Sequence, residues 1–331
     1  MFNYKIDFVL NENQQDCSNL LNEYFNKKEH ILLDAVCGAG KTEMLLKTIN
    51  NALNKNLLVG LACPRKELLK DLYRRVSAYF NNSDFGLICG DVKKNINSNF
   101  IFLTTHQLVN CNKIFDLLII DEIDAFPFYN NFNLEQAALQ KGKQFIFLSA
   151  SVPFKYYDLI KRDKLKLVSN YTRFHQQKMP VPKIIKTRGL VISIIKYCFK
   201  NTNQQIILFV SSLKKGYKYE RLLRIFGFKV KFVYSKNISQ AIINQFRNKE
   251  YQILISTTVL ERGYTFKNIN VLIIEADNAL FDEATLLQIA GRVGRDYQYH
   301  QGHIIMFAHK ITQSMIACTK RIEGYNEMLN M

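Results

Sequence analysis

Short runs of apolar and β-branched residues alternate with amphipathic stretches along the whole chain. The runs predict buried strands and the amphipathic stretches predict helices, an order typical of parallel βαβ units. In the first half we expect strands near His30–Ala35, Leu57–Ala62, Ile101–Thr104, Leu117–Ile120 and Phe145–Leu148, and helices that include Thr42–Leu53 and Arg65–Phe80. In the second half we expect strands near Ile206–Val210, Val230–Val233, Ile253–Ser256, Val271–Glu275 and His303–Phe307, and helices that include Lys214–Ile225, Ser239–Arg247, Asp282–Gly291 and Thr312–Leu329. The pattern predicts an α/β fold with two mostly parallel sheets, each flanked by helices.

The distribution of charge divides the chain unevenly. A length of 331 residues fits about two domains. Residues 1–152 hold 16 basic and 16 acidic side chains, whereas residues 153–331 hold 29 and 12 and so carry the whole net charge of +17. Residues 153–188 are especially basic and hold three of the five prolines. We expect a first domain over 1–152, a basic junction over 153–188, a second domain over 189–331, and a polyanionic partner.

Several classes of protein are excluded by what the sequence lacks. No apolar run approaches the ~18 residues that would span a bilayer, and the first residues have no apolar core of a signal peptide. We therefore expect a cytoplasmic protein without direct membrane insertion. The seven cysteines are odd in number and widely spaced, and none has the spacing of a zinc site, so we expect free thiols and no zinc.

The segment Leu33–Glu43 predicts a phosphate-binding loop. An apolar strand enters the small-residue turn of A-x-x-G-x-G-K-T, which then opens a helix. Gly38 and Gly40 permit close approach of the backbone, Lys41 can reach the β- and γ-phosphates, and the Thr42 hydroxyl can ligate Mg²⁺. The first position of this pattern is usually glycine and is alanine here. The alternative is a chance strand–turn–helix junction.

An apolar strand that ends in D-E-x-D predicts carboxylates at the carboxyl edge of a sheet, where open α/β sheets bind ligands. We assign Asp121 to Mg²⁺ and Glu122 to polarising the attacking water. A solvated acidic turn is the alternative. The phosphate loop earlier in the sequence favours the catalytic interpretation over it.

Two arginines, Arg292 and Arg295, lie three residues apart among glycines after an expected helix. Cations at such a position can stabilise charge on a γ-phosphate supplied from another domain. The alternative is an ordinary basic helix face.

Taken in order, the motifs A-x-x-G-x-G-K-T, D-E-x-D, S-A-S and Q-x-x-G-R-x-G-R resemble those of superfamily 2 helicases and translocases. The chain is more specifically similar to the ComFA family of competence proteins in the stretches AVCGAGKTEM, IIDEIDAFPF, TTVLERGYTF and QIAGRVGR, and in YTRFH followed by PVP. The resemblance covers nearly the whole chain. ComFA proteins carry a four-cysteine zinc module before the first lobe; this sequence has no such cluster, so no role of that module is carried over.

The resemblance implies two RecA-like lobes, with ATP and Mg²⁺ in the cleft between them. It implies nucleotide contacts from Gln14, Gly38, Ala39, Gly40, Lys41, Thr42, Glu43 and Asp121, catalysis by Lys41, Glu122, Gln288, Arg292 and Arg295, and coupling to lobe movement by Ser149, Ser151, Glu261 and Gly263. For Gln14, a solvated helix start is an equal alternative.

Loops after several strands correspond to positions where this superfamily contacts the nucleic-acid backbone. These loops contain Pro64, Arg65, Thr104, Thr105, His106, Ser211, Ser212, Thr257 and Thr258. Hydroxyl groups and backbone amides at strand ends suit the positioning of phosphates. Ordinary loop caps are the alternative.

The function that we expect is an ATPase stimulated by single-stranded DNA, which moves along DNA and drives its uptake in natural transformation. A membrane DNA-uptake channel and other competence proteins would be its partners, at the inner face of the membrane. T-T-V-L-E resembles the T-T-V-x-E pattern of DNA-directed translocases. This resemblance argues against an RNA helicase of the DEAD-box kind, but leaves a replication-restart helicase as a rival. A non-hydrolysing nucleic-acid-binding scaffold, the rival from another class, would not need Glu122, Arg292 or Arg295.

Overall fold

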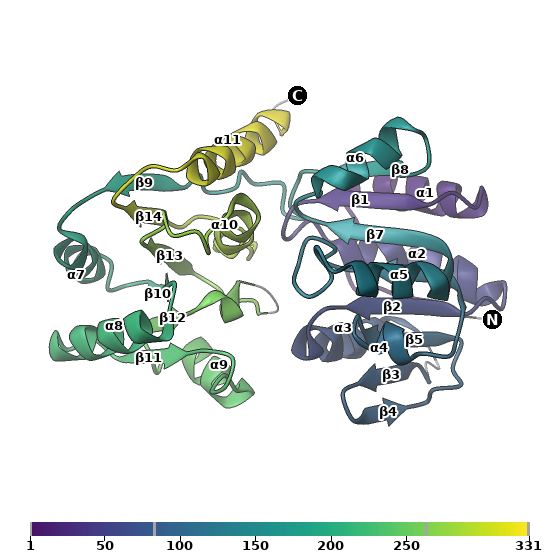
Figure 1. The fold of residues 1–331 in the computed structure, drawn as a ribbon, viewed down its shortest axis with the longest axis horizontal. Helices are drawn as coiled ribbons and strands as arrows, with labels where there is room; N and C mark the ends of the chain where they lie inside the picture. Colours follow the sequence, from purple (N-terminus) through teal and green to yellow (C-terminus); the bar gives the residue numbers. More distant parts are fainter. Residues whose placement is uncertain (1, 82–83, 262–263, 330–331) are drawn as a thin grey trace. The chain divides into compact units, whose positions relative to one another are not determined.

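The computed structural model describes residues 2–81, 84–261 and 264–329. The chain divides into two compact units, Met1–Phe174 and His175–Met331. Figure 1 shows a twisted sheet with helices in each unit.

The first unit is an α/β domain. Its helices are α1 (Glu12–Asn26), α2 (Lys41–Asn54), α3 (Lys66–Tyr79), α4 (Gln107–Asn110), α5 (Phe132–Lys141) and α6 (Phe154–Lys161). Its strands are β1 (Ile31–Ala35), β2 (Val59–Cys63), β3 (Gly86–Cys89), β4 (Val92–Lys94), β5 (Phe100–Thr104), β6 (Phe115–Ile120), β7 (Gly142–Ser149) and β8 (Lys166–Asn170).

The sheet of the first unit has the order β4-β3-β5-β2-β6-β7-β1-β8, and every pairing except β3–β4 is parallel. All residues of β1, β2 and β5 are buried, as expected for strands covered on both faces. One core lies between the sheet and the α4–α6 face, and includes Phe115, Phe145 and Tyr156. Because the long strands are parallel, the loops after β1, β2, β5, β6 and β7 emerge at one edge.

The boundary between the units differs from the one predicted at residue 152. β8 pairs with β1 from Ile31 opposite Lys166 to Ala35 opposite Asn170, so α6 and β8 belong to the first unit. β9 (Lys183–Lys186) pairs with a strand of the second unit. The basic junction is therefore divided between the two units. With the boundary after Phe174, the first unit holds 22 basic and 18 acidic residues and the second holds 23 and 10.

The second unit is built in the same way. Besides β9, its strands are β10 (Gln205–Phe209), β11 (Val230–Val233), β12 (Ile253–Ser256), β13 (Ile269–Ile274) and β14 (Ile304–Ala308). Its helices are α7 (Leu190–Lys200), α8 (Leu213–Ile225), the short 3₁₀ helix η1 (Thr258–Leu260), α9 (Gln240–Arg247), α10 (Glu283–Ala290) and α11 (Gln313–Met328).

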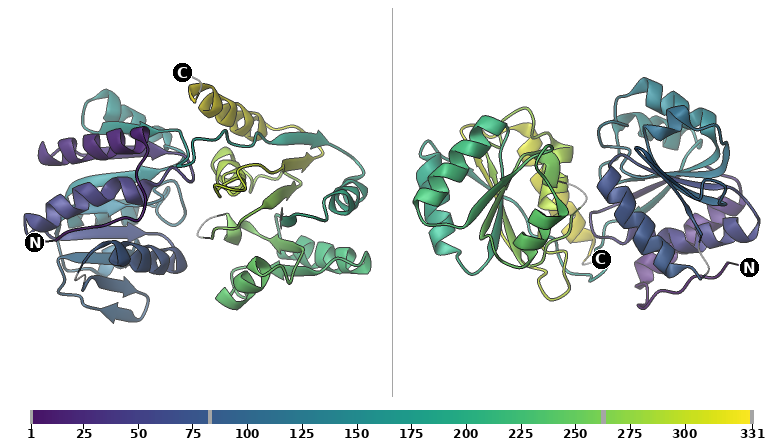
Figure 2. Two further views of the ribbon diagram at one scale, coloured as in Figure 1. Left: turned by 180° about the vertical axis from the view of Figure 1, so that it is seen from behind. Right: turned by 90° about the horizontal axis from the view of Figure 1, so that it is seen from below.

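The sheet of the second unit is parallel throughout, in the order β11-β12-β10-β13-β14-β9. A core of buried side chains from α7 and α8, among them Ile194 and Leu223, packs on one face of this sheet. α10 and α11 pack against each other. Figure 2 shows from two further directions that helices cover both faces of each sheet.

The strands and helices predicted from the sequence are all present, with ends shifted by a few residues. The α/β prediction with two mostly parallel sheets is confirmed. None of the helices that the structure describes combines the length and the apolar character needed to cross a membrane.

The position of β8 generates a test of the domain boundary. A fragment 1–174 should unfold cooperatively, whereas 1–152 should be less stable by at least about 3 kcal/mol, because it lacks the buried side chains of Leu165 and Val168. Urea unfolding followed by circular dichroism measures both values. Equal stability of the two fragments would restore the boundary at residue 152.

Candidate active site

The loop between β1 and α2 has the backbone that close approach to phosphate requires. Gly38 and Gly40 both have left-handed φ values, +87° and +82°, which favour glycine. The Ala39 N–H donates to the Val36 carbonyl over 3.1 Å and closes a tight turn. Gly40 then serves as the N-cap of the 14-residue helix α2 without a side-chain cap. The N–H groups of the first turn of α2 therefore remain available to an anion.

Gln14 supports this loop from α1. Its Nε2 atom donates to the Ala39 carbonyl over 2.9 Å, and its Oε1 atom accepts from the Asn11 N–H over 3.0 Å. A Cβ atom at Gly40 would lie 2.4 Å from Gln14 Nε2, so the amide fits a loop that has glycine there. The structure thus brings Gln14 to the phosphate loop. Its proposed contact with adenine stays a prediction.

Arg75 of α3 lies among the residues that open α2. Its Nη2 atom donates to the Thr42 hydroxyl over 2.9 Å, and its Nε atom lies 3.7 Å from the Glu43 carboxylate. Tyr79 also donates to Glu43 over 3.2 Å, and burial together with Glu43 raises the pKa of Tyr79 to about 12. Arg75 was not predicted from the sequence because it stands on an amphipathic helix outside any motif.

Asp121 and Glu122 follow β6 at the same edge of the sheet. The Asp121 N–H donates to the Ala62 carbonyl over 2.8 Å, which continues the pairing with β2. Loss of hydration and the neighbouring Glu122 raise the pKa of Asp121 to about 6, and the positive charge of Lys41 opposes them. A divalent cation would relieve this repulsion, and oxygen ligands from Asp121 and Thr42 suit Mg²⁺. The residues present therefore fit the implied Mg²⁺ of a bound nucleotide.

The S-A-S motif after β7 is tied to the acidic motif. Ser149 is buried and donates from its hydroxyl to Asp124 Oδ1 over 3.0 Å. The same hydroxyl oxygen accepts from the Ser151 N–H over 2.9 Å. The structure thus brings Ser149, Ser151 and the second aspartate of D-E-x-D together. Their role in coupling stays a prediction.

The predicted nucleic-acid loops of the first unit place their side chains at different depths. Arg65 and His106 reach the surface at the carboxyl edge, whereas Pro64 is buried. Thr104 is 4% exposed and Thr105 is 0% exposed, and the Thr105 N–H donates to the Cys63 carbonyl over 3.0 Å. The two threonine side chains are therefore buried, and their contact with a nucleic-acid backbone stays a prediction.

In the second unit, the predicted hydroxyl groups are engaged locally. Ser212 caps α8 by accepting from the Lys215 N–H over 3.4 Å. Ser211 accepts from Lys215 Nζ over 3.0 Å, and Lys215 also pairs with Glu275 at the end of β13. Thr257 and Thr258 follow β12 and begin η1. For Ser212, the structure thus shows the capping hydrogen bond that the alternative interpretation, an ordinary loop cap, predicts.

The two arginines of the last motif are held differently. Arg292 is buried, and its Nε and Nη2 atoms donate to the Glu261 carbonyl over 2.9 and 2.6 Å, while Nη1 donates to the Tyr264 carbonyl. Arg295 is half-buried and donates from Nε to the Gly291 carbonyl over 2.6 Å. Gln288 is buried on α10. Gly263 lies outside the described residues.

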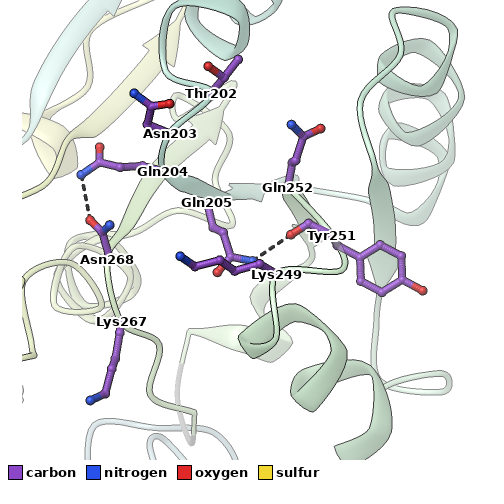
Figure 3. Close-up of a pocket in the computed structure, with 9 residues that line it drawn as sticks. All are labelled: Thr202, Asn203, Gln204, Gln205, Lys249, Tyr251, Gln252, Lys267 and Asn268. Atoms are coloured by element: carbon purple, nitrogen blue, oxygen red, sulfur yellow. Dashed lines mark hydrogen bonds between the residues drawn. The ribbon is translucent and has the colours of Figure 1, made fainter.

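A polar hollow of about 100 Å³ lies at the amino edge of the second sheet, opposite the carboxyl edge (Figure 3). The residues that line it lie just before, or at the first position of, β10, β12 and β13. In it, Gln204 donates to Asn268 over 2.9 Å, and Gln205 donates to the Tyr251 carbonyl over 2.8 Å. Both amides thus have hydrogen-bond partners at the amino edge, away from the edge where parallel sheets bind ligands.

Within the part of the chain that the structure describes, no group of three or more His, Cys, Asp or Glu residues could hold a metal ion. The seven cysteines are free thiols, as predicted. The expectation that the protein binds no zinc stays a prediction.

Comparison with protein families identifies the class. Residues 7–150 match the family model "Type III restriction enzyme, res subunit", and residues 189–297 match "Helicase conserved C-terminal domain". The structure is also similar to S. cerevisiae Dbp5 bound to RNA and ADP BeF3, with a TM-score of 0.66 and 17% identity over 96% of this chain and 91% of that chain. The similarity to Dbp5 supports the fold alone. The chain is thus a superfamily 2 helicase-type enzyme that hydrolyses ATP, with two RecA-like domains.

Two relatives identify the family. The chain is 33% identical to competence protein ComFA of Bacillus subtilis, over 97% of this chain and 73% of that protein. It is 32% identical to competence protein ComFA of Streptococcus pneumoniae, over 95% of this chain and 76% of that protein. The chain belongs to the ComFA family of competence proteins, which confirms the resemblance seen in the motifs.

The raised pKa of Asp121 generates a stability prediction. Its pKa lies above the ordinary 3.8, so the folded protein holds a proton that the unfolded chain releases between about pH 4 and 6. Stability is therefore lost as the pH rises through this window. Asp121→Asn should raise the free energy of unfolding of the nucleotide-free protein at pH 8 by about 1–3 kcal/mol, with a smaller gain toward pH 4.

Asp116 provides the matched control, because its pKa is lowered by the hydrogen bond from Lys143. Asp116→Asn should therefore destabilise the protein at pH 8. Urea unfolding at several pH values measures both variants. Destabilisation by Asp121→Asn at pH 8 would contradict the assignment of charge repulsion at this position.

Proposed function

We propose that this protein is an ATPase stimulated by single-stranded DNA, and that it uses ATP hydrolysis to move along DNA. The observation that supports this most is the gathering of the phosphate loop and the Asp121–Glu122 pair at one edge of the first sheet. The curated relatives are named competence proteins. We extend that role to this chain: it would draw DNA inward at the inner face of the membrane, with an uptake channel and other competence proteins as partners.

Different residues of the first unit would bind the phosphates, hold Mg²⁺ and activate the attacking water. Lys41 and the N–H groups at the start of α2 would bind the β- and γ-phosphates, where the helix dipole adds positive charge. Thr42 and Asp121 would hold Mg²⁺, which neutralises phosphate charge when bound. Glu122 would orient and deprotonate the attacking water. From the second unit, Arg295 would stabilise the charge that develops on the γ-phosphate.

The carboxyl edges of the sheets would bind the DNA backbone. Exposed cations follow strands at these edges: Lys66 after β2, Lys214 after β10 and Lys236 after β11. The second unit has 23 basic and 10 acidic residues, so it would supply most of the attraction to phosphates. The T-T-V-L-E stretch favours DNA over RNA as the polymer.

The decisive experiment measures ATP turnover with no polymer, single-stranded DNA, duplex DNA and RNA. Single-stranded DNA should stimulate wild-type turnover most. Glu122→Gln should lower kcat by roughly 10²–10⁴-fold while retaining nucleotide binding, because only the group that activates water is removed. Lys41→Ala should weaken nucleotide binding itself.

Other outcomes separate the rivals. Greater stimulation by RNA would identify an RNA helicase, and preference for duplex or branched DNA would favour a replication-restart helicase. Full turnover by Glu122→Gln would remove its role as base. Nucleotide-independent DNA binding without any turnover would identify a scaffold.

A salt titration tests where DNA binds. The variant Lys214→Gln/Lys236→Gln removes two cations at the carboxyl edge of the second sheet, and Lys229→Gln/Lys249→Gln removes two exposed cations at the amino edge. If both carboxyl-edge lysines contact phosphates, their loss should flatten the log–log salt dependence by about 1.4, at about 0.7 per contact. The amino-edge variant should keep the wild-type slope. Equal slopes for all three proteins would reject this binding edge.

A further inference from the structure

The chain leaves β8 through residues Asn170–His175, which contain the whole YTRFH stretch and which we call the strap. Within the first unit, the strap is bound to the phosphate loop. The Phe174 N–H donates to the Gly38 carbonyl over 3.2 Å, and the Phe174 carbonyl accepts from Asn11 Nδ2 over 3.2 Å. The same Asn11 caps the helix that carries Gln14. The phosphate loop thus contacts both the strap and Gln14, and both of them contact Asn11.

Further contacts fix this half of the strap. The Val36 N–H donates to the Asn170 carbonyl over 3.1 Å, and Asn13 Nδ2 donates to the Thr172 hydroxyl over 3.3 Å. Arg173 is 1% exposed, and a Cβ atom at Gly38 would lie 3.8 Å from its Cγ atom. The strap therefore follows the position of the phosphate loop closely.

The next residue, His175, is bound within the second unit. Its Nδ1 atom accepts from the Gln177 N–H over 3.1 Å, which assigns the ring proton to Nε2. Nε2 then donates to the Gly294 carbonyl over 2.9 Å in a buried hydrogen bond. Gly294 has φ +70° and lies between Arg292 and Arg295 in sequence. His175 thus holds the turn that leads into Arg295.

We propose that the strap is a mechanical link between the phosphate loop and the arginine-bearing turn, and that His175 is a positioning residue for Arg295. This inference rests on the proposed role of Arg295 in ATP hydrolysis. Phe174 and His175 are consecutive, so their Cα atoms are about 3.8 Å apart and the chain between the two anchors has no slack. A displacement of Gly38 when phosphate binds would therefore be passed to Gly294 through a single peptide bond.

Insertion of two glycines between Phe174 and His175 tests the link, because it leaves both anchors intact and adds slack between them. The matched control places the same insertion between Gln177 and Lys178, which are exposed. This control site lies between two anchors of the second unit, His175 and Met179. Met179 exchanges hydrogen bonds of 2.7 and 2.9 Å with Asn326. Both full-length variants are assayed for affinity for ADP and for kcat of ATP hydrolysis, with and without single-stranded DNA.

The first insertion should lower kcat at least about tenfold, as for a misplaced catalytic group, with affinity for ADP within about twofold of wild type. The control insertion should leave kcat within about twofold. Equal effects of the two insertions, whether large or small, would overturn the strap proposal. If DNA fails to stimulate the wild-type enzyme, the proposed DNA role fails, but the ratio of the two variants in basal turnover still decides the strap.

Substitutions of His175 provide an independent measurement. His175→Ala removes the donor to Gly294 and should lower kcat without changing affinity for ADP. His175→Gln restores a side-chain N–H donor and should recover most of the turnover. A loss of ADP affinity in parallel with kcat, or equal turnover by the two variants, would assign His175 to the stability of the unit instead.

Discussion

Repulsion between Asp121 and Glu122 is the interaction around which the first unit's site is organised. Two neighbouring carboxylates emerge from a buried strand, and burial together with their mutual charge raises the pKa of Asp121 to about 6. A domain selected for stability alone would replace such a pair. Here Lys41, a phosphate loop and an uncapped helix N-terminus lie with it at one edge of the sheet. That combination complements a ligand that brings both phosphate and a divalent cation.

Parallel pairing explains how these groups come together. β1 and β6 flank β7 in the sheet, and since the strands run in one direction their following loops emerge side by side. The phosphate loop, the acidic pair and the Ser149–Asp124 contact are products of this one constraint. The amino edge of the second sheet instead carries Gln204, which donates to the Asn268 side chain, and Gln205, which donates to the Tyr251 carbonyl. The direction of the strands thus places the candidate site residues at the carboxyl edge and not at the amino edge.

The sequence predicted the buried strands and the site loops well because each depends on a local pattern. It missed β8, in which the exposed residues Leu167 and Ser169 alternate with buried ones, so no continuous apolar run marks it. Only its register beside β1 shows that it closes the first unit. Arg75 and His175 were missed for a similar reason. Their partners, Thr42 and Gly294, are distant in sequence, and a motif records residue types but not such contacts.

Arg292 and Arg295 show what a motif leaves undecided even when it is identified correctly. Three nitrogen atoms of Arg292 donate to the carbonyls of Glu261 and Tyr264, so its guanidinium is held by backbone carbonyl groups. Arg295 is less buried, and the turn leading to it depends on the left-handed backbone of Gly294. Because a buried histidine holds that glycine's carbonyl, the direction of Arg295 is set by a residue more than a hundred positions earlier in the chain. The two arginines of one motif are therefore held by different carbonyl groups: those of Glu261 and Tyr264 for Arg292, and that of Gly291 for Arg295.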